Sequence, residues 1–340
     1  MTSVIARNKK RDPSIDILKG VLITLLIVHH VHDFGHRSMG IDSTALDFIQ
    51  LVQRPLILCY FMQTFFLITG MCSNYDKPVK TFIINQVKLL VVPAAVFSFI
   101  WEMTSGIDNV KHSALHVLKG GSYWFLTAMF FAKIIYYVLH KKITNNKIIF
   151  GILIVLSFCG TLLNELDLFK NYYWHRQIFD LSIFIAIGNI FKCKLINTEM
   201  GLICFCIYVV VCALCYAIYG AEIPYVTGGF GTSIDGWLFH LILATCGSIA
   251  VLNACKSIKS SKLLEYAGKQ SLVIYVFHGL FLSYFLKAFA PLLSKGGGVS
   301  FFYAVIIITS VLGNCLFVAY VFDNTKLKVF FGKHLYAYSP

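Results

Sequence analysis

Long apolar runs, bounded by charged or turn-forming residues, repeat along the whole chain. A transmembrane helix needs about 20 such residues to cross a hydrocarbon core of about 30 Å, and most of the runs approach that length. The pattern therefore predicts an all-α, polytopic integral membrane protein with about ten transmembrane helices. The predicted spans are 16–34, 55–73, 87–104, 122–139, 147–164, 177–191, 200–220, 236–254, 271–290 and 300–321.

The first run, DILKGVLITLLIVHHVHDF, carries a lysine near its start and three histidines and an aspartate near its end. Ionisable groups at membrane depth are costly and usually functional. At 100° per residue, Lys19 and His30 lie about 20° apart on one helical stripe, and Asp33 falls about 40° from it. At ~1.5 Å per residue, Lys19 and His30 are separated by roughly 16 Å along the helix axis. One helix would thus present a cation and an imidazole along the same line.

Composition narrows the class of protein further. The chain is 58% hydrophobic and 13% charged, with a mean hydropathy of +0.74, which excludes an ordinary water-soluble domain. No repeat or long polar linker divides it, so we expect one domain over 1–340, with short cytoplasmic tails at 1–13 and 323–340. Cys212 and Cys215 form a C-x-x-C pattern inside an apolar run, where two packed small side chains are the simpler interpretation than a redox or zinc pair.

Basic residues are distributed unequally between the two sets of loops. With the N-terminus placed inside, 20 of the 29 Lys and Arg residues fall on the inner side and eight on the outer side. Cytoplasmic loops are enriched in Lys and Arg, so both termini are predicted to be cytoplasmic. The same loops account for the net charge of +13, and the lipid bilayer rather than a nucleic acid is the expected partner.

Four phrases in the sequence resemble those of the membrane-bound acyltransferase-3 family. In chain order they are RDPSIDILKG (Arg11 to Gly20) followed by His30, FFLITG (Phe65 to Gly70), YWFLTAMFF (Tyr123 to Phe131) and YAGKQSLVIYVFH (Tyr266 to His278). The resemblance covers residues 11–290, and each phrase falls on the expected span. Two departures occur: Lys88 stands alone before Pro93 where the family often has two basic residues, and Thr69 replaces a usual serine.

This resemblance implies transfer of an acyl group, usually acetyl, from a cytoplasmic coenzyme A thioester to a hydroxyl group. The implied acceptor is a cell-envelope glycan or a lipid-linked sugar, and the implied location is the bacterial cytoplasmic membrane. Acetyl-CoA would be a substrate, and no permanently bound cofactor is expected. The family spacing assigns Lys19 and, with less support, Lys88 to the donor.

Acylating an alcohol requires a base near the hydroxyl, stabilisation of the oxyanion, and a grip on the anionic donor. His30 supplies a base, and Asp33, one turn further on, is expected to bond its second ring nitrogen. Lys19 would bind the donor phosphates at the cytoplasmic edge. The structural alternatives are a His30 that only bonds a neighbouring helix and a Lys19 that extends to lipid headgroups.

Other polar residues in the spans are weaker candidates. Trp124 is either an interfacial belt residue or a platform for a sugar ring, and Thr69 either bonds between helices or contacts substrate. His278 is a structural histidine or a support for the site, and Asp180 is a candidate to line the acceptor cavity. Residues four apart on a helix, such as His29 and Asp33, could both bind one metal ion. A single helix would leave the coordination of that ion incomplete, so no metal site is predicted.

A transporter is the competing class of function. Buried ionisable groups also relay protons or bind ions in transporters and channels. The hypothesis favoured by the sequence is a membrane O-acyltransferase, and the alternative is a proton-coupled or ion-binding transporter.

Overall fold

The structure is a computed structural model that describes residues 12–104, 123–166, 173–220 and 233–325. Within these segments the chain is helical and contains no strand. Most of the predicted tails, 1–13 and 323–340, lie outside the described residues.

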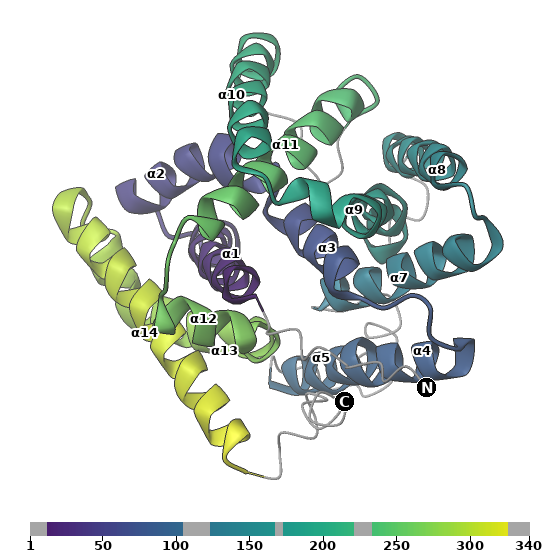
Figure 1. Ribbon diagram of the computed structural model, residues 1–340. Coiled ribbons are helices and arrows are strands. Elements are labelled where there is room, and N and C mark those ends of the chain that lie inside the picture. The colour runs from purple at the N-terminus through teal and green to yellow at the C-terminus, as the bar shows by residue number, and fades with distance from the viewer. Residues whose placement is uncertain (1–11, 105–122, 167–172, 221–232, 326–340) are drawn as a thin grey trace.

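The helices of the first half of the chain run from α1, near the middle of the bundle, to α4 and α5 at one side of it (Figure 1). They are α1 (Pro13–His32), the π-helical turn η1 (Asp33–Ser38), α2 (Thr44–Gln53), η2 (Arg54–Leu58), α3 (Phe61–Cys72), α4 (Val79–Gln86), η3 (Val87–Val91), α5 (Val92–Thr104) and α7 (Trp124–Lys142). The second half comprises α8 (Asn146–Glu165), α9 (Tyr173–Leu195), α10 (Thr198–Tyr219), α11 (Trp237–Lys256), α12 (Lys262–Lys269), α13 (Ser271–Leu293) and α14 (Gly297–Asp323).

Each of the ten predicted apolar runs coincides with helical structure, so the predicted class of fold is confirmed. Among the described residues, seven helices are long and apolar enough to cross a membrane. The run at 55–73 is interrupted by a turn at Cys59 and Tyr60, which leaves α3 as a shorter apolar helix of 12 residues. The two remaining runs, in α7 and α9, carry ionisable residues such as Lys133 and Asp180 that dilute their hydropathy.

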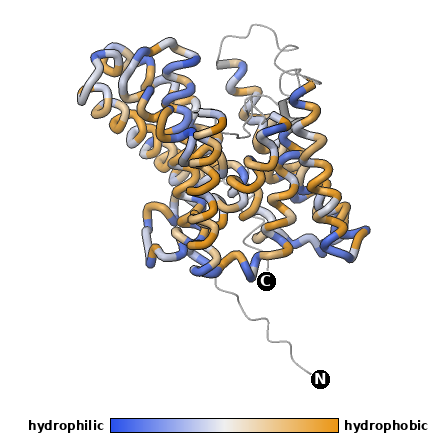
Figure 2. The backbone as a smooth tube through the Cα atoms, turned by 90° about the horizontal axis from the view of Figure 1, so that it is seen from above, coloured by the Kyte–Doolittle hydropathy of each residue, from blue (hydrophilic) through white to orange (hydrophobic). Residues whose placement is uncertain are grey.

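The apolar surface of the bundle is that of a protein surrounded by lipid. Figure 2 shows hydrophobic residues through the middle of the bundle and hydrophilic residues gathered at its two ends. On α14, Phe302 and Phe317 are 62% and 66% exposed, and on α10 Leu202 is 64% exposed. Side chains of this kind on the outside of long helices are stable in hydrocarbon and would be costly in water.

Helix α1 occupies the centre of the bundle because it is apolar on nearly every side. It packs against α2, α3, α11, α12, α13 and α14. Leu18, Leu22 and Ile27 are fully buried. The helix begins at Pro13, and the Asp12 carboxylate caps it by accepting a hydrogen bond from the Ser14 amide at 2.9 Å.

Two helix crossings depend on glycine. A Cβ placed on Gly20 of α1 would lie 2.1 Å from the Leu264 carbonyl oxygen of α12, and one on Gly268 would lie 1.7 Å from the Asp16 carbonyl oxygen. Gly70 of α3 and Gly188 of α9 make a similar crossing, with a built Cβ within 2.1 Å of a facing carbonyl in each case. Small residues let helix backbones approach closely in membranes, where apolar side chains have little drive to associate.

The beginning of α1 and the end of α14 lie on the same side of the bundle. Gly268, at the end of α12, touches Asp16 of α1, and the Gln270 amide that follows donates a hydrogen bond to the Asp323 carboxylate of α14. The structure therefore agrees with an even number of crossings. Which side faces the cytoplasm remains the expectation drawn from the basic loops.

Candidate functional site

One stripe of α1 carries the residues from which the site is built. Lys19, Ile23, Leu26 and His30 follow one another at intervals of four, three and four residues, the spacing of neighbours on one helical face. Ile23 and Leu26 are buried, whereas Lys19 and His30, at the two ends of the stripe, are each partly exposed. Two apolar side chains, Ile23 and Leu26, thus lie between Lys19 and His30 on the same face of α1.

The ring of His30 contacts those of two other histidines. It stacks on that of His278 from α13, with centroids 5.0 Å apart and planes inclined by 25°. The centroid of the His29 ring is 4.9 Å from that of His30. His278 is 6% exposed, so this member of the stacked pair is enclosed by helices. The sequence had left His278 as either structural or supporting, and the structure places it against the predicted base.

The tautomer of neutral His278 follows from its hydrogen bond. Its Nδ1 lies 2.7 Å from the backbone carbonyl oxygen of Tyr275. Because a carbonyl only accepts, Nδ1 must carry the proton, and the lone pair of the neutral ring is on Nε2. His278 therefore offers an acceptor nitrogen beside the His30 ring.

Asp33 does not take the expected position next to His30. The Asp33 carboxylate pairs with Arg37, with 3.4 Å between Oδ1 and Nε, and the buried Nδ1 of His30 has no hydrogen-bond partner in the described part of the chain. The backbone of Asp33 still has α-helical dihedrals at the end of α1. Its carboxylate is instead engaged by Arg37, which lies four residues further on in the π turn η1.

A glutamine on α2 connects the other histidines of α1. Gln53 is buried, and its Oε1 lies 3.0 Å from Nδ1 of His29 while its Nε2 lies 3.3 Å from Nδ1 of His32. The amide accepts from one ring and donates to the other, which places the proton of neutral His29 on Nδ1 and leaves its Nε2 as an acceptor. His36 extends the series by stacking on His32, with centroids 5.6 Å apart. These contacts explain why His29 and His32 turn away from the Lys19 stripe.

Positive charge gathers near the Lys19 end of the stripe. Lys133 of α7 is close enough to Lys19 and Lys77 to interact electrostatically with both, and its ammonium lies 6.0 Å from the centre of the Phe82 ring. At 7% exposure, Lys133 is held inside the bundle. Lys88 is exposed on η3 and makes no hydrogen bond or ion pair with the residues that the structure describes.

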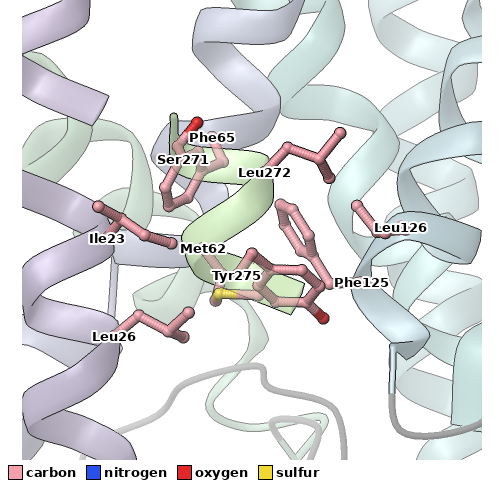
Figure 3. A pocket seen from close by; sticks show the side chains of 9 residues that line it. All are labelled: Ile23, Leu26, Met62, Phe65, Phe125, Leu126, Ser271, Leu272 and Tyr275. Atoms are coloured by element: carbon pink, nitrogen blue, oxygen red, sulfur yellow. The ribbon is translucent and has the colours of Figure 1, made fainter. Parts of the chain in front are cut away.

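A cavity of about 90 Å³ lies between α1, α3, α7 and α13 (Figure 3). Ile23 and Leu26, the middle of the α1 stripe, form one wall, and Tyr275 lies across from them. The complete lining is Ile23, Leu26, Met62, Phe65, Phe125, Leu126, Ser271, Leu272 and Tyr275. The cavity is therefore placed between the Lys19 end of the stripe and the His30 end.

Three of the four phrases that resemble one family line this cavity, and the helix that carries the other phrase lines it as well. The first is followed on α1 by Ile23 and Leu26, the second supplies Phe65, the third supplies Phe125, and the last supplies Tyr275. Segments separated by up to about 250 residues in the chain thus line one small space. That convergence points to the cavity and its two polar ends as the functional site.

Three predicted site residues are placed less centrally. Thr69 is half-buried near the end of α3, beside the Gly70 crossing, and Trp124 is half-buried at the start of α7, with its ring 6.1 Å from that of Phe125. Asp180 is fully buried between α8 and α9, where its Oδ1 accepts a hydrogen bond from Thr161 at 3.3 Å. The Asp180 cluster is thus separate from the histidines of α1.

An aromatic residue missed at the level of sequence lies nearer the histidines. Trp101 of α5 packs on Gly279, the residue after His278, and its ring meets that of Phe34 edge-on at 6.3 Å. Phe34 in turn stands edge-on to His30 at 5.5 Å. Trp101 belongs to none of the four phrases, and only its place on the third predicted span could have drawn attention to it.

The described residues contain no group of three or more His, Cys, Asp or Glu side chains arranged to hold a metal ion. The site they do form is a stacked pair of imidazoles, an apolar cavity and a cationic end. This set can deprotonate a hydroxyl group and bind an anionic donor, and both are needed for acyl transfer.

Comparison with known families agrees with this chemistry. A family model described as an acyltransferase domain, of the acyltransferase-3 type, matches residues 12–319. Searches of curated proteins and of solved structures found no match. The match includes α1, the cavity and both histidines of the stacked pair. The chain therefore belongs to the acyltransferase-3 family and is a multi-pass membrane acyltransferase.

Proposed function

We propose that this protein transfers an acetyl group from acetyl-CoA to a hydroxyl of a cell-envelope glycan or a lipid-linked sugar. The observation that carries the proposal is the cavity bounded by Lys19 at one end of the α1 stripe and the His30–His278 pair at the other. A donor that enters at the cationic end brings its thioester toward the imidazoles. Transport is not favoured, because membership of an acyltransferase family accounts for the same buried groups.

His30 is the proposed base. Its Nδ1 is buried without a partner among the described residues, which leaves Nε2 to receive the proton of the acceptor hydroxyl. As that proton moves to Nε2, the acceptor oxygen bonds the thioester carbonyl carbon and a tetrahedral oxyanion forms. The oxyanion collapses with cleavage of the carbon–sulfur bond, and the imidazolium returns the proton to the coenzyme A thiolate. The products are the O-acyl ester and the free thiol.

His278 is proposed to position His30 rather than to react. Its own proton is committed to the Tyr275 carbonyl, and the stacked rings restrict the rotation of His30. The His29 ring also contacts that of His30 and is held by Gln53. A base held in one orientation loses little entropy when the reaction begins.

The donor end is proposed to be electrostatic. Coenzyme A carries several phosphate charges, and cations near a membrane surface attract such groups. Lys19, partly exposed at this end of the stripe, is the proposed source of the positive field. With the Lys19 end facing the cytoplasm, as the distribution of basic residues predicts, the donor arrives from inside and the glycan from outside. The proposed location is the bacterial cytoplasmic membrane.

The test uses the full-length protein in lipid nanodiscs with acetyl-CoA and envelope polysaccharide extracted from the native host. Release of coenzyme A thiol that depends on the polysaccharide, and a matching increase in acyl mass on the polysaccharide, is expected. His30→Ala should abolish both signals. The matched control is His140→Ala, because His140 lies at the end of α7, where it contacts Asp76 rather than the histidine pair.

Two results would count against the proposal. Thiol release that persists in His30→Ala would remove the assigned base. A substrate flux into protein-containing liposomes, without any loss of thioester, would return the protein to the transporter class.

A further inference from the structure

The cavity lies one helical turn below the stacked histidines. Leu26 precedes His30 by four residues, and Tyr275 precedes His278 by three, so the cavity is about 5 Å from the imidazoles along the two helix axes. Ser271 and Ile23 mark the opposite end, toward Lys19. Any group that connects the cationic end to His30 along this stripe must pass through the cavity.

The lining selects the chemistry of its occupant. Seven of the nine lining residues have wholly apolar side chains, and the other two, Ser271 and Tyr275, contribute neutral hydroxyl groups. No charged side chain belongs to this lining. A phosphate or a sugar would lose its hydration here without recovering hydrogen bonds, whereas an acyl group would not. The lining thus fits the uncharged thioester end of the donor.

The volume limits the size of that occupant. A cavity of about 150 Å³ lined by Leu, Ile and Phe binds benzene, which has six carbons. In proportion, the present volume of about 90 Å³ holds about four heavy atoms. An acetyl thioester has four at its reacting end: the sulfur, the carbonyl carbon and oxygen, and the methyl carbon. A hexanoyl chain adds four methylene groups, which exceed this volume.

We propose that the cavity between α1, α3, α7 and α13 is the acyl-binding chamber of the enzyme and that its walls restrict the donor to short acyl groups. This inference rests on the proposed acyl transfer from coenzyme A. Leu26 and Met62 are the walls to test, because they are 2% and 4% exposed and line the cavity from two different helices. Shortening either side chain should lengthen the acyl group that is accepted.

The first experiment compares ligands with the unmodified protein. Binding of coenzyme A, acetyl-CoA, butyryl-CoA and hexanoyl-CoA to the protein in nanodiscs is measured by calorimetry, with empty nanodiscs subtracted. Overpacking a filled apolar site costs about 1 to 3 kcal/mol, so hexanoyl-CoA should bind about tenfold or more weakly than acetyl-CoA. Equal affinity for the two would overturn the chamber.

The second experiment changes the chamber. Leu26→Ala and Met62→Ala should each recover most of the lost affinity for hexanoyl-CoA while leaving that for free coenzyme A unchanged. Leu22→Ala is the matched control, because Leu22 is fully buried on the same helix and does not line the cavity. Met62→Ala, on α3, keeps the test available should Leu26→Ala fail to fold.

The outcomes separate the chamber from the proposed function. The protein could bind free coenzyme A while Leu22→Ala gains as much affinity for hexanoyl-CoA as Leu26→Ala and Met62→Ala do. That result would refute the chamber and leave the enzyme assignment intact. A protein that binds no coenzyme A derivative at all would refute the proposed donor, and the chamber with it.

Discussion

The imidazole of His30 on α1 stacks on the imidazole of His278 on α13, with 5.0 Å between ring centroids. The two residues are 248 positions apart in the chain. One ring has its proton fixed by a backbone carbonyl, and the other has no hydrogen-bond partner on its buried nitrogen among the described residues. The pair therefore combines a fixed ring with a ring available to substrate.

Replacing His278 should distinguish packing from polarity at this contact. His278→Ala removes the stack and should reduce the rate of thiol release by about 100-fold, because a base that is free to rotate loses its alignment. His278→Phe retains an aromatic surface without the Nε2 lone pair. Recovery of most of the rate in the phenylalanine variant would assign His278 to positioning through stacking. If both variants keep the original rate, the pair has no role in the reaction.

Lys19 should affect donor binding more than the chemical step. Removing a charge-assisted contact to phosphate costs about 1.5 to 3 kcal/mol, so Lys19→Ala should raise the Kd for coenzyme A by about tenfold or more. The difference in Kd between Lys19→Ala and the unmodified protein should shrink at high salt, because salt screens the attraction between Lys19 and the phosphates. Lys192→Ala is the control, since Lys192 is exposed at the end of α9. Calorimetry at two salt concentrations measures both effects. If the ratio of the two Kd values, Lys19→Ala over the unmodified protein, is the same at both concentrations, the electrostatic role is contradicted.

Gln53 is expected to stabilise the protein by bridging His29 and His32 of α1. Gln53→Leu keeps the volume roughly constant but leaves Nδ1 of His29 and of His32 without the amide that each now contacts. An unsatisfied buried polar group costs about 1 to 3 kcal/mol. The apparent Tm, measured by thermal aggregation in detergent, should therefore fall. Gln50→Leu, on the same helix and partly exposed, should change the Tm much less, and equal falls would refute the bridging role.

The glycine crossing of α1 and α12 gives a sharper stability test. Gly20→Ala places a methyl group 2.1 Å from the Leu264 carbonyl, so the helices must separate at a cost of about 1 to 3 kcal/mol. Gly151→Ala, within α8, meets no atom within 4 Å and should preserve or slightly raise stability. The apparent Tm of the two variants should therefore change in different directions. A Gly20→Ala protein as stable as the original would show that the crossing is not tight.

Sequence periodicity was sufficient for the fold and for one face of the site. The apolar runs located the helices, and the 3.6-residue repeat placed Lys19 and His30 on one stripe. Periodicity could not identify what that stripe faces, because partners such as Tyr275 and His278 come from the far end of the chain. It also could not show that the Asp33 carboxylate pairs with Arg37 rather than with His30.

The resemblance of the four phrases carried information that periodicity did not. It drew attention to segments containing Phe65, Phe125 and Tyr275, although the roles first assigned there were to Thr69, Trp124 and His278. The cavity is formed by apolar neighbours of those polar residues. Apolar side chains in a membrane span give no signal of their own, because every span is rich in them.

The glycines of the α1–α12 crossing also fix the lengthwise alignment of α13. Gly268 holds the last turn of α12 against Asp16, and α13 starts only three residues later. A helix is a stiff rod, so the height at which α13 begins determines the height of every side chain along it. The height at which the imidazoles of His30 and His278 meet is thus set by two residues that have no side chain, Gly20 near the start of α1 and Gly268 on α12, just before α13 begins.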